Sequence, residues 1–135
     1  MLGRLDTSTQ SEPAPTAFGI TCQELDESTN VVSVQGELDL TTAPRLKWML
    51  LDCLQEGRNR IVVDLSKTTF MDSTALGVLV VVNRRLDPGA RLAIACAQEN
   101  VLKIFELSGM DGVFAILPTI EEALAFAHGR VAGAT

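Results

Sequence analysis

A serine that precedes a helix, with no catalytic base beside it, is the residue of this sequence best placed to take part in chemistry. Residues 61–80 read IVVDLSKTTFMDSTALGVLV, an apolar run that ends at Asp64, a short polar connection, and Asp72-Ser73-Thr74 before an apolar segment of helical length. A strand that ends, turns and feeds a helix displays its turn residues, so Ser73 is expected at a helix N-terminus. A serine nucleophile needs an activating base. The pattern therefore predicts a hydroxyl that is acted upon by another protein.

Ser73 also has a structural interpretation. Ser, Thr and Asp are the preferred N-cap residues of helices, so Ser73 could simply cap the helix that follows. If Ser73 is modified instead, the cap falls to Asp72 or Thr74. A phosphate at this position would add about −1.5 to −2 charges, which a helix N-terminus accommodates well. Phosphorylation would then change the surface without unfolding the domain.

The usual signatures of enzymes are missing from the sequence. It contains no GxxxxGK[ST] or GxGxxG phosphate loop, no HExxH metal motif and no GxSxG elbow around Ser73. The one histidine, His128, is near the C-terminus and is expected to be a solvated residue at a helix end. We therefore expect no catalytic residues, no bound metal, and no hydrolase, kinase or phosphatase activity.

A second possible phosphate acceptor is a carboxylate. Asp64 ends an apolar run and Lys67 follows it, as in a receiver-type phosphoaspartate site. Such a site needs further acidic residues to hold Mg²⁺, which Glu37 and Asp39 could supply. The alternative is that Asp64 is a strand-end carboxylate that accepts hydrogen bonds from backbone N–H groups of the next loop.

The composition limits the classes of protein to which this chain can belong. A chain of 135 residues with 47% apolar residues is expected to form one domain with a sizeable core. Its net charge is −6 and no basic footprint for nucleic acid is evident in the sequence, so we expect no nucleic-acid partner. The three cysteines, Cys22, Cys53 and Cys96, are widely spaced and contain no CxxC pair, so we expect buried free thiols and a reducing cytoplasm.

The N-terminus does not predict export. Residues 1–17 are rich in Ser, Thr, Pro and Ala and lack the apolar stretch of a secretory signal, so we expect a disordered tail. The longest apolar run, residues 75–82, is too short to span a bilayer. These features favour a cytoplasmic protein without a membrane partner.

The periodicity of apolar residues predicts alternating strands and helices. The opening hairpin adds an antiparallel edge strand to a mainly parallel five-stranded sheet with about four helices, an α/β fold. Trp48, one position off the apolar stripe of the first helix, is expected to pack half-buried rather than to bind a partner. The predicted strands cover 18–22, 31–35 (closed by Gly36), 61–65, 92–96 and 113–117, and the predicted helices cover 43–54 (capped by Thr41 or Thr42), 73–86, 101–107 and 121–128.

One segment resembles a known family. Residues 64–79 are similar to the phosphorylation-site segment of STAS-domain anti-sigma factor antagonists. They consist of DLS, FMDS and LGVL, separated by three and by two residues. Gly36-Glu37-Leu38-Asp39 follows a short strand, as the first acidic segment of that family does, and the order of elements over residues 18–127 also fits. The family usually carries a second serine and a glycine after the acceptor, where this sequence has Thr74 and Ala75.

The resemblance implies a single STAS-type domain over residues 18–130. It implies that Ser73 is the phosphoacceptor, with Thr74 as the rival, and that Asp39 and Asp72 lie beside it on the surface that binds the partner. The unphosphorylated form would bind an anti-sigma factor, often itself a serine kinase that uses ATP and Mg²⁺, and so release a sigma factor. Phosphorylation at Ser73 would abolish this binding until a serine phosphatase removed the phosphate. The chain would need no cofactor and would catalyse neither step.

Three other interpretations stay open at this point. The domain could be a scaffold or sensory-complex module that assembles with like domains, although its tail is short for a sensor. It could also be a small-molecule or nucleotide-binding domain. Asp39 and Asp72 could be ordinary solvated loop carboxylates.

Overall fold

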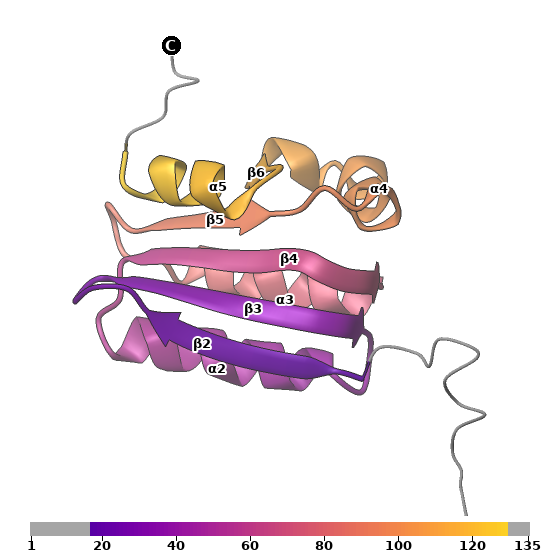
Figure 1. The fold of residues 1–135 in the computed structure, drawn as a ribbon, viewed down its shortest axis with the longest axis horizontal. Coiled ribbons are helices and arrows are strands. Elements are labelled where there is room, and N and C mark those ends of the chain that lie inside the picture. Colours follow the sequence, from indigo (N-terminus) through magenta and orange to yellow (C-terminus); the bar gives the residue numbers. More distant parts are fainter. Residues whose placement is uncertain (1–16, 130–135) are drawn as a thin grey trace, which may run out of the picture.

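A five-stranded sheet forms the middle of the molecule (Figure 1). The computed structural model describes residues 17–129, so all but the last residue of the predicted tail, residues 1–17, lies outside the described range. The strands are β2 (Gly19–Glu24), β3 (Thr29–Leu38), β4 (Arg60–Met71), β5 (Arg91–Ala95) and β6 (Ala115–Leu117), in that spatial order. Only β2 is antiparallel to its neighbour. The predicted sheet and its antiparallel edge strand are therefore confirmed.

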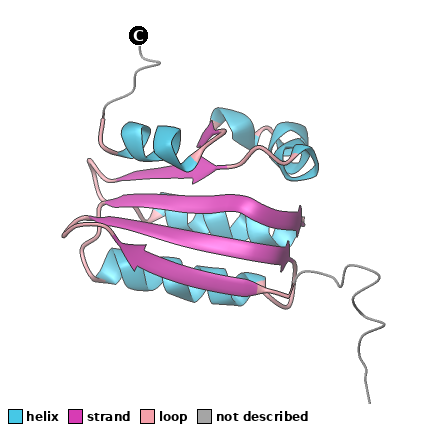
Figure 2. Cartoon of the chain, viewed as in Figure 1, coloured by secondary structure: helices cyan, strands magenta, loops and turns pink. Residues whose placement is uncertain are grey.

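Helices cover the two faces of the sheet unequally. The main core packs one face against α2 (Ala43–Gln55), α3 (Ser73–Arg84) and α4 (Glu99–Ser108), of which α2 and α3 lie behind the sheet in Figure 2. A smaller cluster packs the other face of β3, β4 and β5 against α5 (Ile120–Ala127), and the short helix η1 (Met110–Gly112) precedes β6. The four α-helices agree with the predicted number.

Strands β3 and β4 are longer than their sequences suggest. The polar residues 66–69, expected to be a connection, belong to β4, and β3 continues past Gly36 to Leu38. The pairing register shifts twice along this pair, and β4 carries the extra residue each time. Such bulges interrupt the alternation of apolar and polar residues. Gly36 has a φ of 88°, a conformation that glycine adopts without strain, and so bends β3 rather than ending it.

Side chains at the start of α4, from its N-cap Gln98 and from Asn100, bond to the bulged half of β4. Gln98 Nε2 donates to Ser66 O at 3.2 Å, and Asn100 Nδ2 donates to Thr69 O. Within the strand pair, the buried Thr68 hydroxyl donates to Val34 O at 2.9 Å. These bonds occupy carbonyl groups in the irregular part of the strand, and they hold the end of β4 in a defined position ahead of Ser73.

Three expectations about single residues are wrong. Trp48 is 62% exposed on α2, because it points away from the stripe that packs on the sheet. Cys22 is exposed because β2 is the edge strand, whereas Cys53 and Cys96 are buried. His128 is half-buried rather than solvated, since its ring lies against Leu124 O at 2.8 Å and Thr29 Oγ1 at 3.3 Å.

Candidate functional site

The ends of β3 and β4 bring the two acidic segments together. Leu38 and Met71, the last residues of the two strands, are partners in the parallel ladder. The backbone N–H of Asp72 donates to Leu38 O at 3.1 Å. Asp39 and Asp72 therefore follow neighbouring strand ends at the same edge of the sheet, although 33 positions separate them in the sequence.

Asp72 is the N-cap of α3. Its backbone is extended, and its carboxylate accepts hydrogen bonds from Thr74 N at 2.9 Å and Ala75 N at 3.2 Å. The negative charge also complements the positive end of the helix dipole. The capping role that the sequence allowed for Ser73, Thr74 or Asp72 thus belongs to Asp72.

Ser73 is the first residue of α3 and is exposed. Its side chain makes none of the hydrogen bonds found within residues 17–129. Gly77 and Val81 follow it at intervals of four residues, and both are exposed on the same side of the helix. A Cβ atom placed on Gly77 would meet nothing within 4 Å, so the helix surface beside Ser73 is open.

Asp39 is held in one arrangement by the residues that follow it. One carboxylate oxygen accepts from Thr41 Oγ1 at 2.8 Å, Thr41 N at 3.0 Å and Thr42 N at 3.2 Å. The Thr41 hydroxyl, together with these backbone N–H groups, holds the pKa of Asp39 below its ordinary value. Thr42, one of the two predicted cap residues, is the N-cap of α2, although its hydroxyl makes no cap hydrogen bond and donates to Glu37 O at 2.8 Å. Asp39 is therefore an ordered, charged group and not a freely solvated loop carboxylate.

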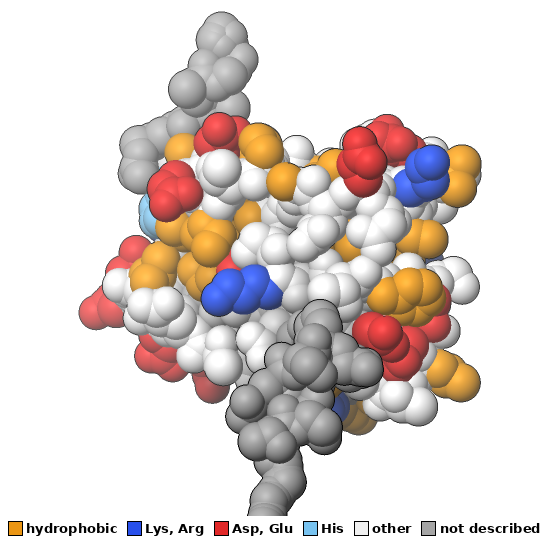
Figure 3. Space-filling model, turned by 45° about the vertical axis from the view of Figure 1, so that its right-hand side comes forward, with side chains coloured by type: hydrophobic (Ala, Val, Ile, Leu, Met, Phe, Trp, Pro, Cys, Tyr) orange, Lys and Arg blue, Asp and Glu red, His pale blue; other side chains and the backbone are white. Residues whose placement is uncertain are grey.

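Exposed apolar side chains adjoin both aspartates. Leu40, next to Asp39, is 70% exposed, and Phe70, two residues before Asp72, is 44% exposed. Hydrophobic and acidic side chains lie next to one another on the right side of the molecule in Figure 3, toward the end of the sheet where β3 and β4 finish. Sequence reasoning did not single out Leu40 or Phe70, although an apolar residue directly beside an acidic motif and outside the helical stripe was a usable signal.

His128 cannot act on Ser73. It contacts Thr29, the first residue of β3, whereas Ser73 lies beyond the last residue of that strand. At about 3.3 Å per residue, the ten residues of β3 separate the two side chains by roughly 30 Å. As His128 is the one histidine of the sequence, no histidine base is available to the Ser73 hydroxyl.

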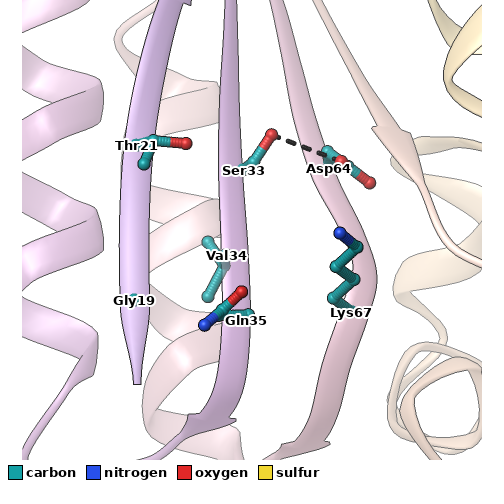
Figure 4. A pocket seen from close by; sticks show the side chains of 7 residues that line it. All are labelled: Gly19, Thr21, Ser33, Val34, Gln35, Asp64 and Lys67. Carbon is teal, nitrogen blue, oxygen red and sulfur yellow. Dashed lines mark hydrogen bonds between the residues drawn. The ribbon is translucent and has the colours of Figure 1, made fainter. Parts of the chain in front are cut away.

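Asp64 lies in a shallow polar hollow on the sheet (Figure 4). It is in the middle of β4, not at its end, and is only 7% exposed. Its carboxylate accepts from Ser33 Oγ at 3.3 Å and, as anticipated, from a backbone N–H, that of Ser66 at 3.0 Å. No group of acidic, histidine or cysteine side chains suited to a metal ion occurs within residues 17–129. Asp64, Glu37 and Asp39 are thus not brought together as a phosphoaspartate site requires.

The family model of the STAS domain matches residues 23–123. The chain belongs to the STAS domain family. This STAS domain is 35% identical over 80 residues to an anti-sigma-B factor antagonist of Staphylococcus epidermidis, an alignment that covers 58% of the chain and 74% of the relative. It is 25% identical over 99 residues to an anti-sigma-F factor antagonist of Mycobacterium tuberculosis, covering 73% of the chain and 81% of that relative.

A solved structure extends the comparison to the fold. The crystal structure of an anti-sigma factor antagonist from Mycobacterium paratuberculosis superimposes with a TM-score of 0.79 at 26% identity. The match covers 85% of this STAS domain chain and 97% of the other. Within residues 17–129, no helix has the length and apolar character needed to cross a bilayer.

Proposed function

We propose that this STAS domain is an anti-sigma factor antagonist whose partner binding is controlled by phosphorylation of Ser73. The observation that carries the proposal is the exposed Ser73 hydroxyl on the first residue of α3, free of the capping duty that Asp72 performs. The antagonists of Staphylococcus epidermidis and Mycobacterium tuberculosis support the class of partner. The protein acts in the cytoplasm, where it binds an anti-sigma factor and releases a sigma factor.

The switch works through charge at a surface that otherwise suits a protein partner. Leu40 and Phe70 supply apolar contact area, and Asp39 and Asp72 supply fixed negative charge beside Ser73. A phosphate on Ser73 adds about −1.5 to −2 charges next to these carboxylates. The helix N-terminus tolerates the phosphate, so the domain stays folded while a partner that fits the small hydroxyl is rejected.

The anti-sigma factor is also the kinase in this proposal. It transfers phosphate from ATP to Ser73, and a separate serine phosphatase removes it. Thr74 is the rival acceptor, but it is half-buried and its backbone N–H is engaged by Asp72. This chain is the substrate in both reactions and supplies neither a base nor a metal ion to them.

Intact-mass measurement tests the acceptor. We expect one phosphoryl group on the wild type after incubation with a candidate anti-sigma kinase, ATP and Mg²⁺. Thr74→Val, which keeps the size of the side chain, should be modified to the same extent, and Ser73→Ala should stay unmodified. Modification of Ser73→Ala together with loss of modification in Thr74→Val would move the switch to Thr74.

Calorimetric titration with the anti-sigma factor tests the switch. Ser73→Ala should bind like the wild type because it removes no charge. Ser73→Glu should bind at least about tenfold more weakly, a loss of ~1.4 kcal/mol, and phosphorylated wild type more weakly still. Gln23→Glu adds the same charge on β2 at the far end of the sheet and should bind normally. Undiminished binding by fully Ser73-phosphorylated protein would contradict the mechanism.

The same titration tests the apolar part of the surface. Leu40→Ser should weaken binding at least about tenfold, because it removes the apolar side-chain area that Leu40 would bury against the partner, and full burial of a leucine contributes about 1.5–3 kcal/mol. Val113→Ser is the control. It makes a similar change at a different exposed residue, which is 53% exposed, and this variant should bind normally. Equal binding by both variants would show that Leu40 is not part of the interface. The formation of large homotypic complexes without an anti-sigma partner would favour the scaffold interpretation.

A further inference from the structure

Two of the three cysteines lie on the same side of the sheet although their sequence positions are far apart. Cys22 is on edge strand β2, opposite Val32 in the antiparallel ladder, and Val32 belongs to the core that packs against α2. Paired residues of an antiparallel ladder point to the same face, so the Cys22 side chain is directed toward α2. Cys53 lies near the end of α2 and is buried in that same core.

A single amide group lies between the two sulfurs. Asn30 Nδ2 is 3.3 Å from Cys22 Sγ and 3.2 Å from Cys53 Sγ. The sulfurs can therefore be no farther apart than the sum of these two distances. Burial raises the pKa of the Cys53 thiol to about 11, a rise that the Asn30 amide opposes and the nearby Cys22 sulfur increases. The Cys22 sulfur thus lies close enough to the Cys53 thiol to influence it.

Asn30 has no other evident role in the part of the chain described. Its side chain is 1% exposed, and its Oδ1 has no hydrogen-bond partner among residues 17–129. A buried polar side chain that is only partly satisfied is costly for folding. Its N–H groups, aimed at two sulfurs, can stabilise negative charge on either of them.

The two cysteines differ in access to solvent. Cys22 is exposed, while Cys53 is 2% exposed. An oxidant in solution therefore reacts first with Cys22. Cys53 lies buried next to it, and its raised pKa keeps its thiol protonated at neutral pH. This is the arrangement of an exposed cysteine with an adjacent resolving cysteine.

We propose that Cys22 and Cys53 form a reversible intramolecular disulfide when a hydroperoxide oxidises Cys22. The Cys22 thiolate attacks one peroxide oxygen, the O–O bond breaks, and hydroxide or alkoxide leaves, which gives a sulfenic acid. The Cys53 sulfur then attacks the Cys22 sulfur, the S–O bond breaks, and the oxygen leaves as water with the proton of Cys53. Two thiols lose two electrons and two protons in total, and the peroxide takes them up. The proposal does not depend on the proposed switch at Ser73.

The disulfide would link edge strand β2 covalently to α2. It would close a loop of about 30 residues, and cross-links of that length stabilise a fold by restricting its unfolded state. The oxidised protein should therefore unfold several degrees higher than the reduced protein. Thiol reductants should reverse both the bond and the shift.

Peptide mapping of the full chain under non-reducing conditions tests the bond. After treatment of the reduced protein with hydrogen peroxide, we expect the number of free thiols to fall from three to one and a cross-linked peptide pair with Cys22 and Cys53. Cys96→Ala, at the third and buried cysteine, is the matched control and should form the same cross-link. Cys22→Ser, a change at an exposed site that leaves the core intact, should form none and show no shift in unfolding temperature.

A trapping experiment tests the order of the steps. In Cys53→Ala, Cys22 should accumulate as a sulfenic acid that reacts with dimedone, while the wild type should trap far less. Intermolecular Cys22 dimers, a cross-link that includes Cys96, over-oxidation of Cys22 without a cross-link in the wild type, or thiols that stay unreacted would each overturn the proposal.

Discussion

At the level of single residues, Asp72 and Ser73 perform different tasks at the start of α3. Asp72 holds the first turn through its two hydrogen bonds, which leaves the adjacent hydroxyl uncommitted. This division would allow Ser73, the proposed acceptor, to be modified without loss of the helix. Because both residue types are good caps, the sequence predicted a cap in this tripeptide but could not decide which residue it is.

Removal of the cap should cost stability, whereas removal of the acceptor should not. We expect Asp72→Ala to lower the free energy of unfolding by about 1 kcal/mol, because Thr74 N and Ala75 N lose their acceptor. Ser73→Ala should change it by less than about 0.5 kcal/mol. Urea unfolding followed by circular dichroism measures both values, and a larger loss in Ser73→Ala would mean that Ser73 shares the cap.

The Asp39 carboxylate should titrate below the usual range of aspartate. The Thr41 hydroxyl is the main cause of its lowered pKa, so Thr41→Val should move the titration midpoint up toward the ordinary value. Asp26, whose pKa is lowered to about 2 by its own bonds to Ser28 and Thr29, is an internal control and should not move. NMR of the carboxyl carbons between about pH 2 and 6 measures both.

The sign of the effect on stability follows from that lowered pKa. A carboxylate with a lower pKa in the folded state contributes stability at pH values above its unfolded-state pKa. This contribution is lost as the pH falls through the folded-state pKa. We therefore expect Thr41→Val to reduce stability at neutral pH but to differ less from the wild type in acid, and an increasing difference toward low pH would contradict the assignment.

At the level of elements, α3 combines one buried face with one open face. Ala75, Leu76, Leu79 and Val82 pack into the core, while Ser73, Gly77 and Val81 are exposed. A glycine inside a helix lowers its stability, yet Gly77 has no close neighbour that would exclude a side chain. An open helix surface beside Ser73, the proposed acceptor, would allow close approach of a partner.

Substitution of Gly77 should therefore stabilise the isolated domain. We expect Gly77→Ala to raise the free energy of unfolding by roughly 0.5–1 kcal/mol. Gly57→Ala is the contrasting control, because Gly57 has a φ of 82° and should lose stability when a Cβ is added. Denaturant unfolding measures both, and a loss of stability in Gly77→Ala would show that the helix surface is less open than its contacts indicate.

The elements themselves were largely predictable, with the full lengths of β3 and β4 as the exceptions. The apolar periodicity of residues 61–65 predicted a strand of less than half the observed length of β4, which has 12 residues, since Lys67 and Thr69 do not continue the alternation. The rest of β4 is held by non-local bonds, such as Thr68 Oγ1 to Val34 O and Asn100 Nδ2 to Thr69 O. The local sequence of β4 does not predict these distant partners.

At the level of the whole molecule, the candidate interface lies at one end of the sheet, and the cysteine pair lies between edge strand β2 and the end of α2. Ser73 follows β4 at its C-terminal end, whereas Asn30 lies near the start of β3. Changes at one site should therefore leave the other largely unaffected.

We expect residues 1–16 to be dispensable for partner binding, because their sequence has no apolar periodicity and is dominated by Ser, Thr and Pro. Deletion of these residues should change the affinity for the anti-sigma factor by less than about threefold, below ~1 kcal/mol. Calorimetric titration of the full and shortened chains provides the comparison. A tenfold loss would show that the tail contributes to the interface.

The sequence by itself determined the order of strands and helices, the STAS family segment and the candidate acceptor, because apolar periodicity, cap residues and a contiguous motif are local properties. Only the tertiary structure decided that Asp72 is the cap and that Leu40, Phe70 and Trp48 are exposed. It also put Asp39 and Asp72, which the resemblance had assigned to one surface, at neighbouring strand ends. Only the tertiary structure places Cys22 and Cys53 beside the same side-chain amide, that of Asn30. These features depend on strand register and on which strand forms the edge, and both are set by contacts between segments that are distant in the chain.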